Sequence, residues 1–215
     1  MGSSEYKMSM GLFKYLPLRK DRILDFINKG IYAAKTNQLN DPYEQIGIEE
    51  AERYRVVCLT RSRNKRILWA YYASGPGCCV EFVFDKKDDG VINKVIYDKI
   101  SVFRSIRQQQ DPAVSLLHKD KKFYEEKEFR AVLDYSRPID NKFWFKENDK
   151  VYYKARVRRI YFAPFSEKQE DYQSVLKEVR EYNQNQKYKK DFIEVKKYKL
   201  DEEKYFFRID NSFVF

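Results

Sequence analysis

Short runs of β-branched and aromatic residues recur along this 215-residue chain, and they constrain its fold more than any other feature. Residues 55–60 read Arg-Val-Val-Cys-Leu-Thr, an apolar run bounded by charge that is typical of a buried strand. Further strands are predicted at 31–34, 78–84, 91–97, 128–133, 151–162, 192–198 and 205–209. Because strands outnumber helices, the pattern predicts an α+β fold with a mixed, mostly antiparallel sheet core and flanking helices.

Four helices are predicted around this sheet. The first opens near Pro17 and stops at Gly30, a residue suited to a C-terminal cap. Two more cover residues 67–73 and 114–126. The clearest begins at Ser166, where Ser-Glu-Lys-Gln matches a capping box. Its helical spacing predicts an apolar face made of Tyr172, Val175, Leu176 and Val179.

The connections indicate one domain. Asp88-Asp89-Gly90 is a tight-turn signal, and it predicts that 78–84 and 91–97 pair as a hairpin. No internal repeat or low-complexity linker interrupts the chain, so we expect a single domain over residues 1–215. Within this domain, the basic C-terminal part covers residues 150–200.

The cysteines and the apolar content indicate a reducing compartment. The three cysteines are Cys58, Cys78 and Cys79, an odd number with two adjacent, and their spacing predicts neither a disulfide framework nor a zinc site. No stretch approaches the roughly 18 apolar residues of a membrane-spanning helix. The N-terminal residues 1–11 lack the apolar core of a secretory signal. We therefore expect a cytoplasmic protein with no membrane partner.

The charge predicts a polyanionic partner. The formal net charge is +10, and the chain holds 18 Tyr and 16 Phe. Excess positive charge attracts polyanions, and tyrosines offer flat surfaces on which bases stack. An AT-rich genome would also favour aromatic residues, but it explains the surplus of Lys and Arg less well.

Basic residues concentrate in the C-terminal third. Strand alternation predicts that Lys154, Arg156 and Arg158 lie on one face, as a groove for a phosphate backbone. Lys189 and Lys190 follow, beside tyrosines, and extend the predicted nucleic-acid-binding surface. The alternatives are a solvated face without a partner and a surface for an acidic protein such as an antitoxin or chaperone.

Four segments in the first part of the chain combine aromatic and charged residues. They are Phe13-Lys14-Tyr15, Leu39 to Glu44, Leu68 to Ala73, and Phe123 to Arg130. In this order they resemble a large bacterial family known mainly as a domain of unknown function. Its members carry Tyr-Arg/Lys-Tyr, Phe-Asn-Asp-Pro-x-Glu, Met-Trp-x-His-Tyr-Ala and Trp-x-Tyr-Glu-x-Glu-x-Arg elements. The chain has Leu68, Tyr71 and Phe123 where the family has Met, His and Trp.

A second, looser pattern consists of Lys14, then Thr60 or Ser62, then Glu126-Lys127-Glu128. It is similar to the ADP-ribosyltransferase superfamily, where a polar residue on an early strand, a Ser or Thr ending a middle strand, and an E-x-E element complete the site. The resemblance implies NAD as substrate. Cleavage of the nicotinamide–ribose bond builds a sugar cation, which a carboxylate stabilises. If they lie on a strand, both glutamates point to the same side.

The resemblance implies a role for each candidate residue. Glu128 would be the catalytic carboxylate and Glu126 would orient the acceptor. The NAD-binding residues would be Lys14 and Arg19 on the pyrophosphate, Thr60 or Ser62 on the ribose, and Tyr71 or Tyr72 against nicotinamide. The acceptor would be a nucleic acid, either RNA or single-stranded DNA, and the setting a toxin or phage-defence effector with a neutralising partner. The single histidine, His118, is expected to be structural.

Two other functions compete with this one. Asp41 or Glu44 with Glu125-Glu126-Lys127 imitates the acidic residues and E-x-K element of a Mg²⁺-dependent nuclease. In a chain with 35% charged residues, this pattern arises easily by chance. The second alternative is a non-catalytic, basic nucleic-acid-binding module.

Overall fold

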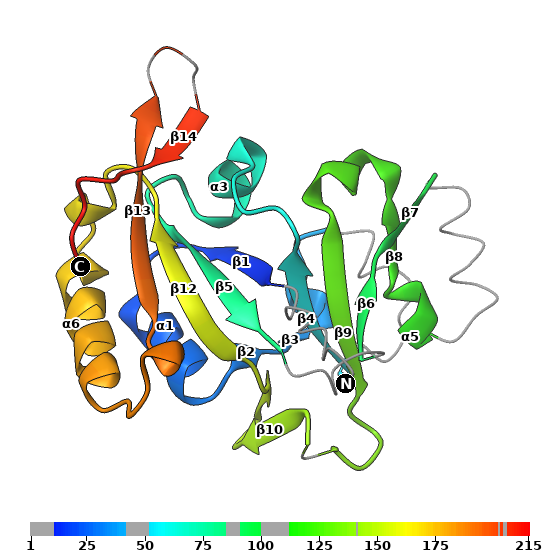
Figure 1. Ribbon diagram of the computed structural model, residues 1–215. Helices are drawn as coiled ribbons and strands as arrows, with labels where there is room; N and C mark the ends of the chain where they lie inside the picture. The colour runs from blue at the N-terminus through cyan, green and yellow to red at the C-terminus, as the bar shows by residue number, and fades with distance from the viewer. Residues whose placement is uncertain are drawn as a thin grey trace, which may run out of the picture.

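The computed structural model describes residues 11–41, 52–84, 91–99, 112–140, 142–201, 203 and 206–215. In this part of the chain the main element is a nine-stranded sheet in the order β14-β13-β12-β5-β1-β4-β9-β6, with β3 also paired to β4 (Figure 1). Its strands are β1 (Leu12–Leu16), β3 (Ala34–Lys35), β4 (Tyr54–Thr60), β5 (Cys78–Val83), β6 (Ile92–Lys94), β9 (Glu128–Asp134), β12 (Arg156–Phe162), β13 (Glu194–Asp201) and β14 (Phe206–Ile209). The predicted mixed class with a mostly antiparallel sheet is confirmed, since β12 and β13 are its one parallel pair among the described strands.

Two smaller sheets and several helices complete the described part. The smaller sheets contain β10 (Trp144–Glu147), β11 (Lys150–Tyr153) and β2 (Ile31–Tyr32), and β7 (Ile96–Asp98) with β8 (His118–Asp120). The α-helices are α1 (Lys20–Asn28), α3 (Arg66–Tyr72), α5 (Pro112–Ser115) and α6 (Asp171–Gln184), and the 3₁₀ helices include η3 (Lys121–Glu126), η4 (Ser166–Lys168) and η5 (Lys189–Asp191). None of the helices described is long and apolar enough to cross a membrane.

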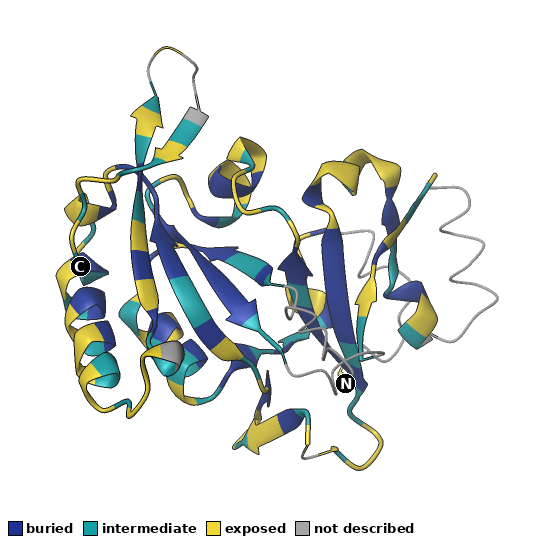
Figure 2. Cartoon of the chain, viewed as in Figure 1, coloured by how far each residue is buried: buried dark blue, intermediate teal, exposed yellow. Residues whose placement is uncertain are grey.

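Helices cover both faces of the main sheet. Alternate residues of its strands point to opposite faces, so one face packs on α1 and α6 through residues such as Phe26 and Val175. The other face places Tyr15 and Tyr161 against Trp69 of α3. Figure 1 shows α1 and α6 side by side, with α3 apart from them. The central strands are buried and the outer side of α6 is exposed (Figure 2). The predicted apolar face of α6 is confirmed: Tyr172, Val175, Leu176 and Val179 are all buried.

The sheet divides between β1 and β4. These two neighbouring strands, which are both fully described, pair only at Phe13 and Thr60. In contrast, β1 pairs with β5 along its whole length, and β4 pairs with β9 from Tyr54 to Thr60. Lys14 bridges the division, because its Nζ donates to the carbonyl oxygen of Cys58 at 3.0 Å. The main sheet therefore consists of two halves joined by few contacts.

The predicted hairpin of residues 78–84 with 91–97 is wrong. Strand β5 pairs with β1 and β12, whereas β6 pairs with β9, and Ile96–Asp98 forms β7 in another sheet. The expected turn at 88–90 lies outside the described residues. Strand β5 is central, with Cys78, Cys79, Val80 and Phe82 fully buried. A strand that is buried on both faces finds partners from distant segments, which local turn signals do not encode.

The predicted helix at 114–126 is also wrong. Helix α5 ends at Ser115, residues His118–Asp120 form β8, and Lys121–Glu126 form the 3₁₀ helix η3. Tertiary contacts override the helical propensity here. Strand β8 pairs in parallel with β7, and His118 Nδ1 lies 2.7 Å from Asp98 Oδ2. This contact gives His118 a structural partner away from the carboxylates that follow.

The capping box predicted at Ser166 is absent. Ser166 begins only the short η4, and its hydroxyl donates to the carbonyl oxygen of Ala163. Gln169 has an extended backbone, with ψ of 139°, so the segment cannot run on as one helix. Helix α6 starts five residues later, at Asp171. The predicted stop at Gly30 is correct, because α1 ends at Asn28 and the Gly30 amide bonds to the Asp25 carbonyl oxygen.

Gly30 supports a direct test of the packing at the end of α1. Its φ is +105°, and a Cβ atom there would lie 2.3 Å from the carbonyl oxygen of Tyr153. We expect Gly30→Ala to lower the free energy of unfolding by about 3 kcal/mol, from backbone strain plus overpacking. Gly75→Ala is the matched control, because Gly75 has φ of +82° but no atom within 4 Å of the added Cβ. Urea unfolding of both variants measures the difference, and equal losses would show that the contact with Tyr153 is unimportant.

Candidate functional site

A pocket of about 430 Å³, including its open mouth, lies where β1 and β4 diverge. Its wall includes Lys14, Cys58, Thr60, Tyr72, Glu126 and Glu128. The division of the sheet creates the space, and α3 and η3 provide its sides. Sites for small ligands are usually concave and mostly apolar, with a few converging polar groups. This pocket is therefore the candidate functional site.

Besides β4, four segments that are far apart in the sequence meet in this pocket. Phe13, Lys14 and Tyr15 come from β1, and Asn40 comes from the loop after η1 (Thr36–Gln38). Leu68 and Tyr72 come from α3, and Glu126 and Glu128 from η3 and β9. All four segments that carry the resemblance to the bacterial family thus contribute to one site.

Lys119 lies at the centre of the buried charges. Its Nζ is 2.7 Å from Glu126 Oε2 and 3.3 Å from Glu128 Oε2, and the residue is 1% exposed. Strand β8 positions it, because the segment turns directly from β8 into η3 and returns toward β9. The ammonium group holds the two carboxylates together, where their like charges would otherwise repel each other.

Glu128 is neutralised mainly by Arg130. The guanidinium Nε and Nη2 donate to the two carboxylate oxygens at 2.9 Å each, and Arg130 Nη1 donates to the Leu116 carbonyl oxygen. Both residues are almost fully buried. Burial alone would raise the pKa of Glu128, but Arg130 and Lys119 outweigh it and bring this pKa from 4.5 to about 2. Glu128 is therefore ionised at neutral pH and firmly held.

Glu126 faces a less charged environment. Tyr72 OH donates to Glu126 Oε1 at 2.6 Å, and Asn40 Nδ2 donates to the Tyr72 oxygen at 2.8 Å. Burial raises the pKa of Tyr72 well above its ordinary value, with a further contribution from Glu126, so the hydroxyl stays protonated. Glu126 shares Lys119 with Glu128 and has no arginine partner among the described residues. Its carboxylate is the less neutralised of the two.

The alignment of the two glutamates has a different origin from the one predicted. Glu126 is the last residue of η3 and Glu128 the first residue of β9, so strand alternation does not relate them. Between them Lys127 takes the left-handed conformation, with φ of 47°. Thr60, the last residue of β4, fixes this turn, because its hydroxyl donates to the Glu126 carbonyl oxygen.

Lys14 forms the floor of the pocket between the diverging strands. Besides donating to Cys58, its ammonium interacts electrostatically with Glu128. Burial lowers the pKa of Lys14 below its ordinary value. A cation in this position supports the sheet and adds positive potential to the pocket.

Three predicted NAD-binding residues do not line the pocket. Arg19 pairs with Asp21 at 2.8 Å on the surface. Ser62 lies just beyond Thr60, and its carbonyl oxygen accepts a hydrogen bond from Tyr15 OH. Tyr71 is 68% exposed and is not part of the pocket lining. The pocket therefore unites Lys14, Thr60, Tyr72, Glu126 and Glu128 of the predicted set.

The groove of Lys154, Arg156 and Arg158 stays a prediction, and part of its charge is already engaged by carboxylates. Lys154 precedes β12, and a bulge between Val157 and Arg159 breaks the alternation of the strand. As a result, both Arg158 and Arg159 reach Glu81, at 3.5 and 3.2 Å. Arg156 lies 3.9 Å from Asp191.

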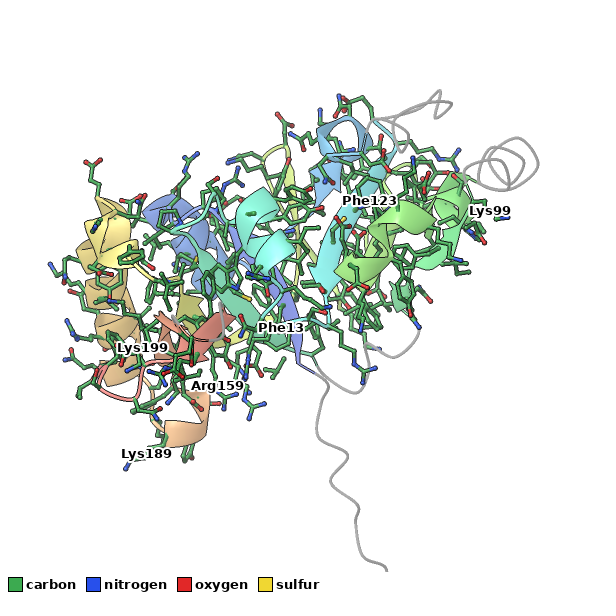
Figure 3. All side chains as sticks on the ribbon, turned by 90° about the horizontal axis from the view of Figure 1, so that it is seen from above. Phe13, Lys99, Phe123, Arg159, Lys189 and Lys199 are labelled. Carbon is green, nitrogen blue, oxygen red and sulfur yellow. The ribbon has the colours of Figure 1, made fainter. Side chains whose placement is uncertain are left out.

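The C-terminal basic residues also lie away from the pocket. Figure 3 shows Lys189 at one end of the molecule and Phe13, which lines the pocket, in the middle. Lys189 is an exposed residue of η5, and the side chain of Lys190 lies outside the described part. This tract is therefore not a wall of the candidate site.

The described residues offer no cluster of three metal-ligating side chains. Of the residues proposed for a magnesium site, Asp41 is buried, Glu44 lies outside the described part, and Glu125 is an exposed partner of Lys65. Glu126 is bound by Lys119.

Two residues of the site, Lys119 and Arg130, were not selected from the sequence. Arg130 ends the segment that resembles the bacterial family, so a signal for it was present. Lys119 stood in the middle of the segment predicted to be a helix, and nothing distinguished it from the surrounding lysines.

No family model, curated protein or solved structure matches this chain.

Proposed function

We propose that this protein is an NAD-dependent ADP-ribosyltransferase and that the pocket between β1 and β4 binds the nicotinamide-ribosyl part of NAD. The observation that carries the proposal is the convergence of two buried carboxylates, Glu126 and Glu128, with Lys14 and Tyr72 in one pocket. A small apolar-walled pocket with converging carboxylates suits a reaction that forms a sugar cation.

The topology also supports a fold of the ADP-ribosyltransferase type. Lys14 lies on β1, Thr60 is the last residue of β4, and Glu128 is the first residue of β9. These three strands are consecutive neighbours in the sheet. The three elements of the superfamily pattern therefore stand side by side, in the order that the resemblance implies. The convergence of all four family-like segments in the same pocket supports the resemblance to the bacterial family as well.

The proposed reaction breaks the bond between the nicotinamide nitrogen and ribose C1′. The bonding electrons leave with nicotinamide, which becomes neutral, and positive charge develops on C1′ and the ring oxygen. The acceptor nucleophile then bonds to C1′ and releases its proton. A carboxylate next to C1′ stabilises the cation, and a carboxylate next to the acceptor takes the proton.

We assign the role of stabilising the cation to Glu126 rather than Glu128. Arg130 donates to both oxygens of Glu128, so the field of that carboxylate is largely cancelled. Glu126 shares one lysine and otherwise receives a hydrogen bond from the neutral Tyr72 hydroxyl. Unlike a cationic partner, the neutral phenol does not cancel the charge of the carboxylate, and its hydrogen bond fixes the carboxylate orientation. Glu128 then acts by holding Lys119, and through it Glu126.

The acceptor follows from charge. The net charge of +10 favours a polyanion, and a nucleic acid is the polyanion that offers nucleophilic base and sugar atoms. An enzyme that modifies nucleic acid must be restrained in its own cell, so a toxin or phage-defence effector is the setting we propose.

The test is NAD cleavage combined with protection of Cys58. Cys58 lines the pocket and is partly exposed, whereas Cys78 and Cys79 are fully buried, with burial raising the pKa of both thiols. Iodoacetamide is therefore expected to label Cys58 selectively in the native protein, and NAD to slow this labelling. Peptide mass spectrometry measures the labelling, and chromatography measures the release of nicotinamide.

The control for labelling is Cys58→Ser, which should take up no reagent under native conditions. Label transfer from NAD to RNA, DNA or protein then identifies the acceptor. If millimolar NAD neither protects Cys58 nor releases nicotinamide, the pocket serves a different ligand. Cleavage of nucleic acid that requires Mg²⁺ would instead favour a nuclease.

A further inference from the structure

Two exposed segments border the mouth of the pocket. One consists of the loop after β4 and α3 up to Tyr71, residues 61–71. The other consists of η3 and Lys127. The backbone amide of Arg61 donates to the Lys127 carbonyl oxygen at 3.3 Å, and Lys65 Nζ pairs with Glu125 Oε2 at 2.6 Å. Tyr72, which follows the first segment, and Glu126, which belongs to the second, both line the pocket. The two segments therefore form a continuous rim, which we call the α3–η3 rim.

The α3–η3 rim carries several exposed cationic side chains. Arg61, Arg66, Lys121 and Lys122 are exposed, and none has an ion-pair partner among the described residues. The acidic residues of the same segments are unavailable to them: Glu125 is paired with Lys65, and Glu126 is buried against Lys119. By contrast, Arg158 and Arg159 on β12 are paired with Glu81. Exposed cations without an ion-pair partner among the described residues therefore lie at the pocket mouth.

Two aromatic side chains of the same rim are exposed to solvent. Tyr71 is 68% exposed and Tyr124 is 53% exposed. The ring of Tyr124 packs edge-on against Tyr97 at a centroid distance of 5.5 Å, which fixes its orientation while leaving it accessible. Tyr97 in turn accepts a hydrogen bond from the Glu128 amide. Exposed aromatic rings between cations are the combination that binds unpaired bases and their phosphates.

We propose that the α3–η3 rim binds single-stranded nucleic acid, with bases stacked on Tyr71 and Tyr124 and phosphates on Arg61, Arg66 and Lys121. A duplex would hide its base faces in the stack, so the rim selects unpaired strands. The inference that the bound strand is the acceptor rests on the proposed function, because the rim then delivers a nucleotide to the pocket. The binding itself does not depend on that function.

The experiment measures fluorescence anisotropy of labelled strands of about 12 nucleotides, within the usual site size for such surfaces. It uses the full chain without NAD, and single-stranded RNA, single-stranded DNA and duplexes of the same sequence. We expect the single strands to bind more tightly than the duplexes. Tyr71→Ala and Tyr124→Ala should each weaken binding by about 10-fold, the size of one lost stacking contact. Arg66→Ala should reduce the slope of log affinity against log salt by about 0.7.

The matched control is Lys189→Ala, which removes an equally exposed cation far from the pocket and should leave affinity within about 2-fold, because surface charges away from the bound strand contribute little. If the protein binds single strands but does not cleave NAD, the proposed enzymatic function is wrong and the proposed binding by the rim stands. If the Tyr71→Ala, Tyr124→Ala double variant keeps full affinity, or if duplexes bind more tightly than single strands, the proposal that the rim binds single strands is wrong. If Lys189→Ala loses more affinity than the rim variants, the C-terminal basic residues form the nucleic-acid-binding surface instead.

Discussion

Replacing Glu128 with Gln should destabilise the protein by about 3–5 kcal/mol, the usual loss when one partner of a buried ion pair is removed. Arg130 is 1% exposed and makes two of its hydrogen bonds to the Glu128 carboxylate. The amide of Gln accepts with one oxygen only and brings no negative charge. The buried guanidinium would then lose the negative charge that Glu128 supplies. Urea unfolding followed by fluorescence measures the change.

The dependence on pH gives this prediction a second readout. Because the folded-state pKa of Glu128 lies below its ordinary 4.5, at about 2, its contribution is fully present above pH 4.5 and is lost as the pH falls toward 2. Glu128→Gln lacks the titrating group. The difference in stability between wild type and variant should therefore be constant near neutral pH and shrink below pH 4.5.

Glu125→Gln is the matched control for the stability measurement. It makes the same chemical change three residues away, where the carboxylate is 58% exposed and pairs with Lys65. An exposed pair contributes at most about 1 kcal/mol, so this variant should remain close to wild type. Equal destabilisation by the two substitutions would contradict the structural role of the Glu128–Arg130 pair.

Replacing Glu126 with Gln should lower the rate of NAD cleavage by about 100-fold to 1,000-fold, the typical cost of losing one electrostatic contact to a transition state. The substitution keeps the size of the side chain and removes its charge. Its fold should persist, since Lys119 retains Glu128 and Tyr72 can accept from the new amide. Single-turnover release of nicotinamide measures the loss, and thermal unfolding checks the fold.

Tyr72→Phe separates orientation from charge at Glu126. It removes the 2.6 Å hydrogen bond but leaves the carboxyl group of Glu126 in place. A hydrogen bond to a charged group contributes about 1.5–3 kcal/mol, so we expect roughly a 10-fold to 100-fold loss of rate. A Glu126→Gln variant that cleaves NAD at the wild-type rate would remove Glu126 from the chemistry.

Individual strands were predictable, but their pairing was not. The apolar runs at 55–60 and 128–133 became β4 and β9 because their composition reports burial directly. The partner of β5 is β12, which follows about 70 residues later in the chain, and no local signal specifies such a contact. The segment at 114–126 failed for a related reason. Its pairing with β7 and the burial of Lys119 decide its conformation, and both are tertiary effects.

The site was predictable where it coincided with a resemblance. Lys14, Thr60, Tyr72, Glu126 and Glu128 were all selected from sequence patterns, and all line one pocket. Lys119 was not selected, because it is one of 43 lysines and arginines and its neighbours are also charged. Only the path of β8 shows that this lysine is buried between two carboxylates. A charged residue whose role depends on burial cannot be identified from the sequence before the fold is known.

The division between β1 and β4 links ligand occupancy to the cohesion of the entire sheet. Along most of their length these strands do not form ladder hydrogen bonds with each other. The hydrogen bond from the Lys14 ammonium to Cys58 replaces only a small part of that ladder. A molecule that touches residues of both strands crosslinks the two half-sheets from within. Since only the native state offers both surfaces, each increase in bound fraction raises the melting temperature of the whole domain.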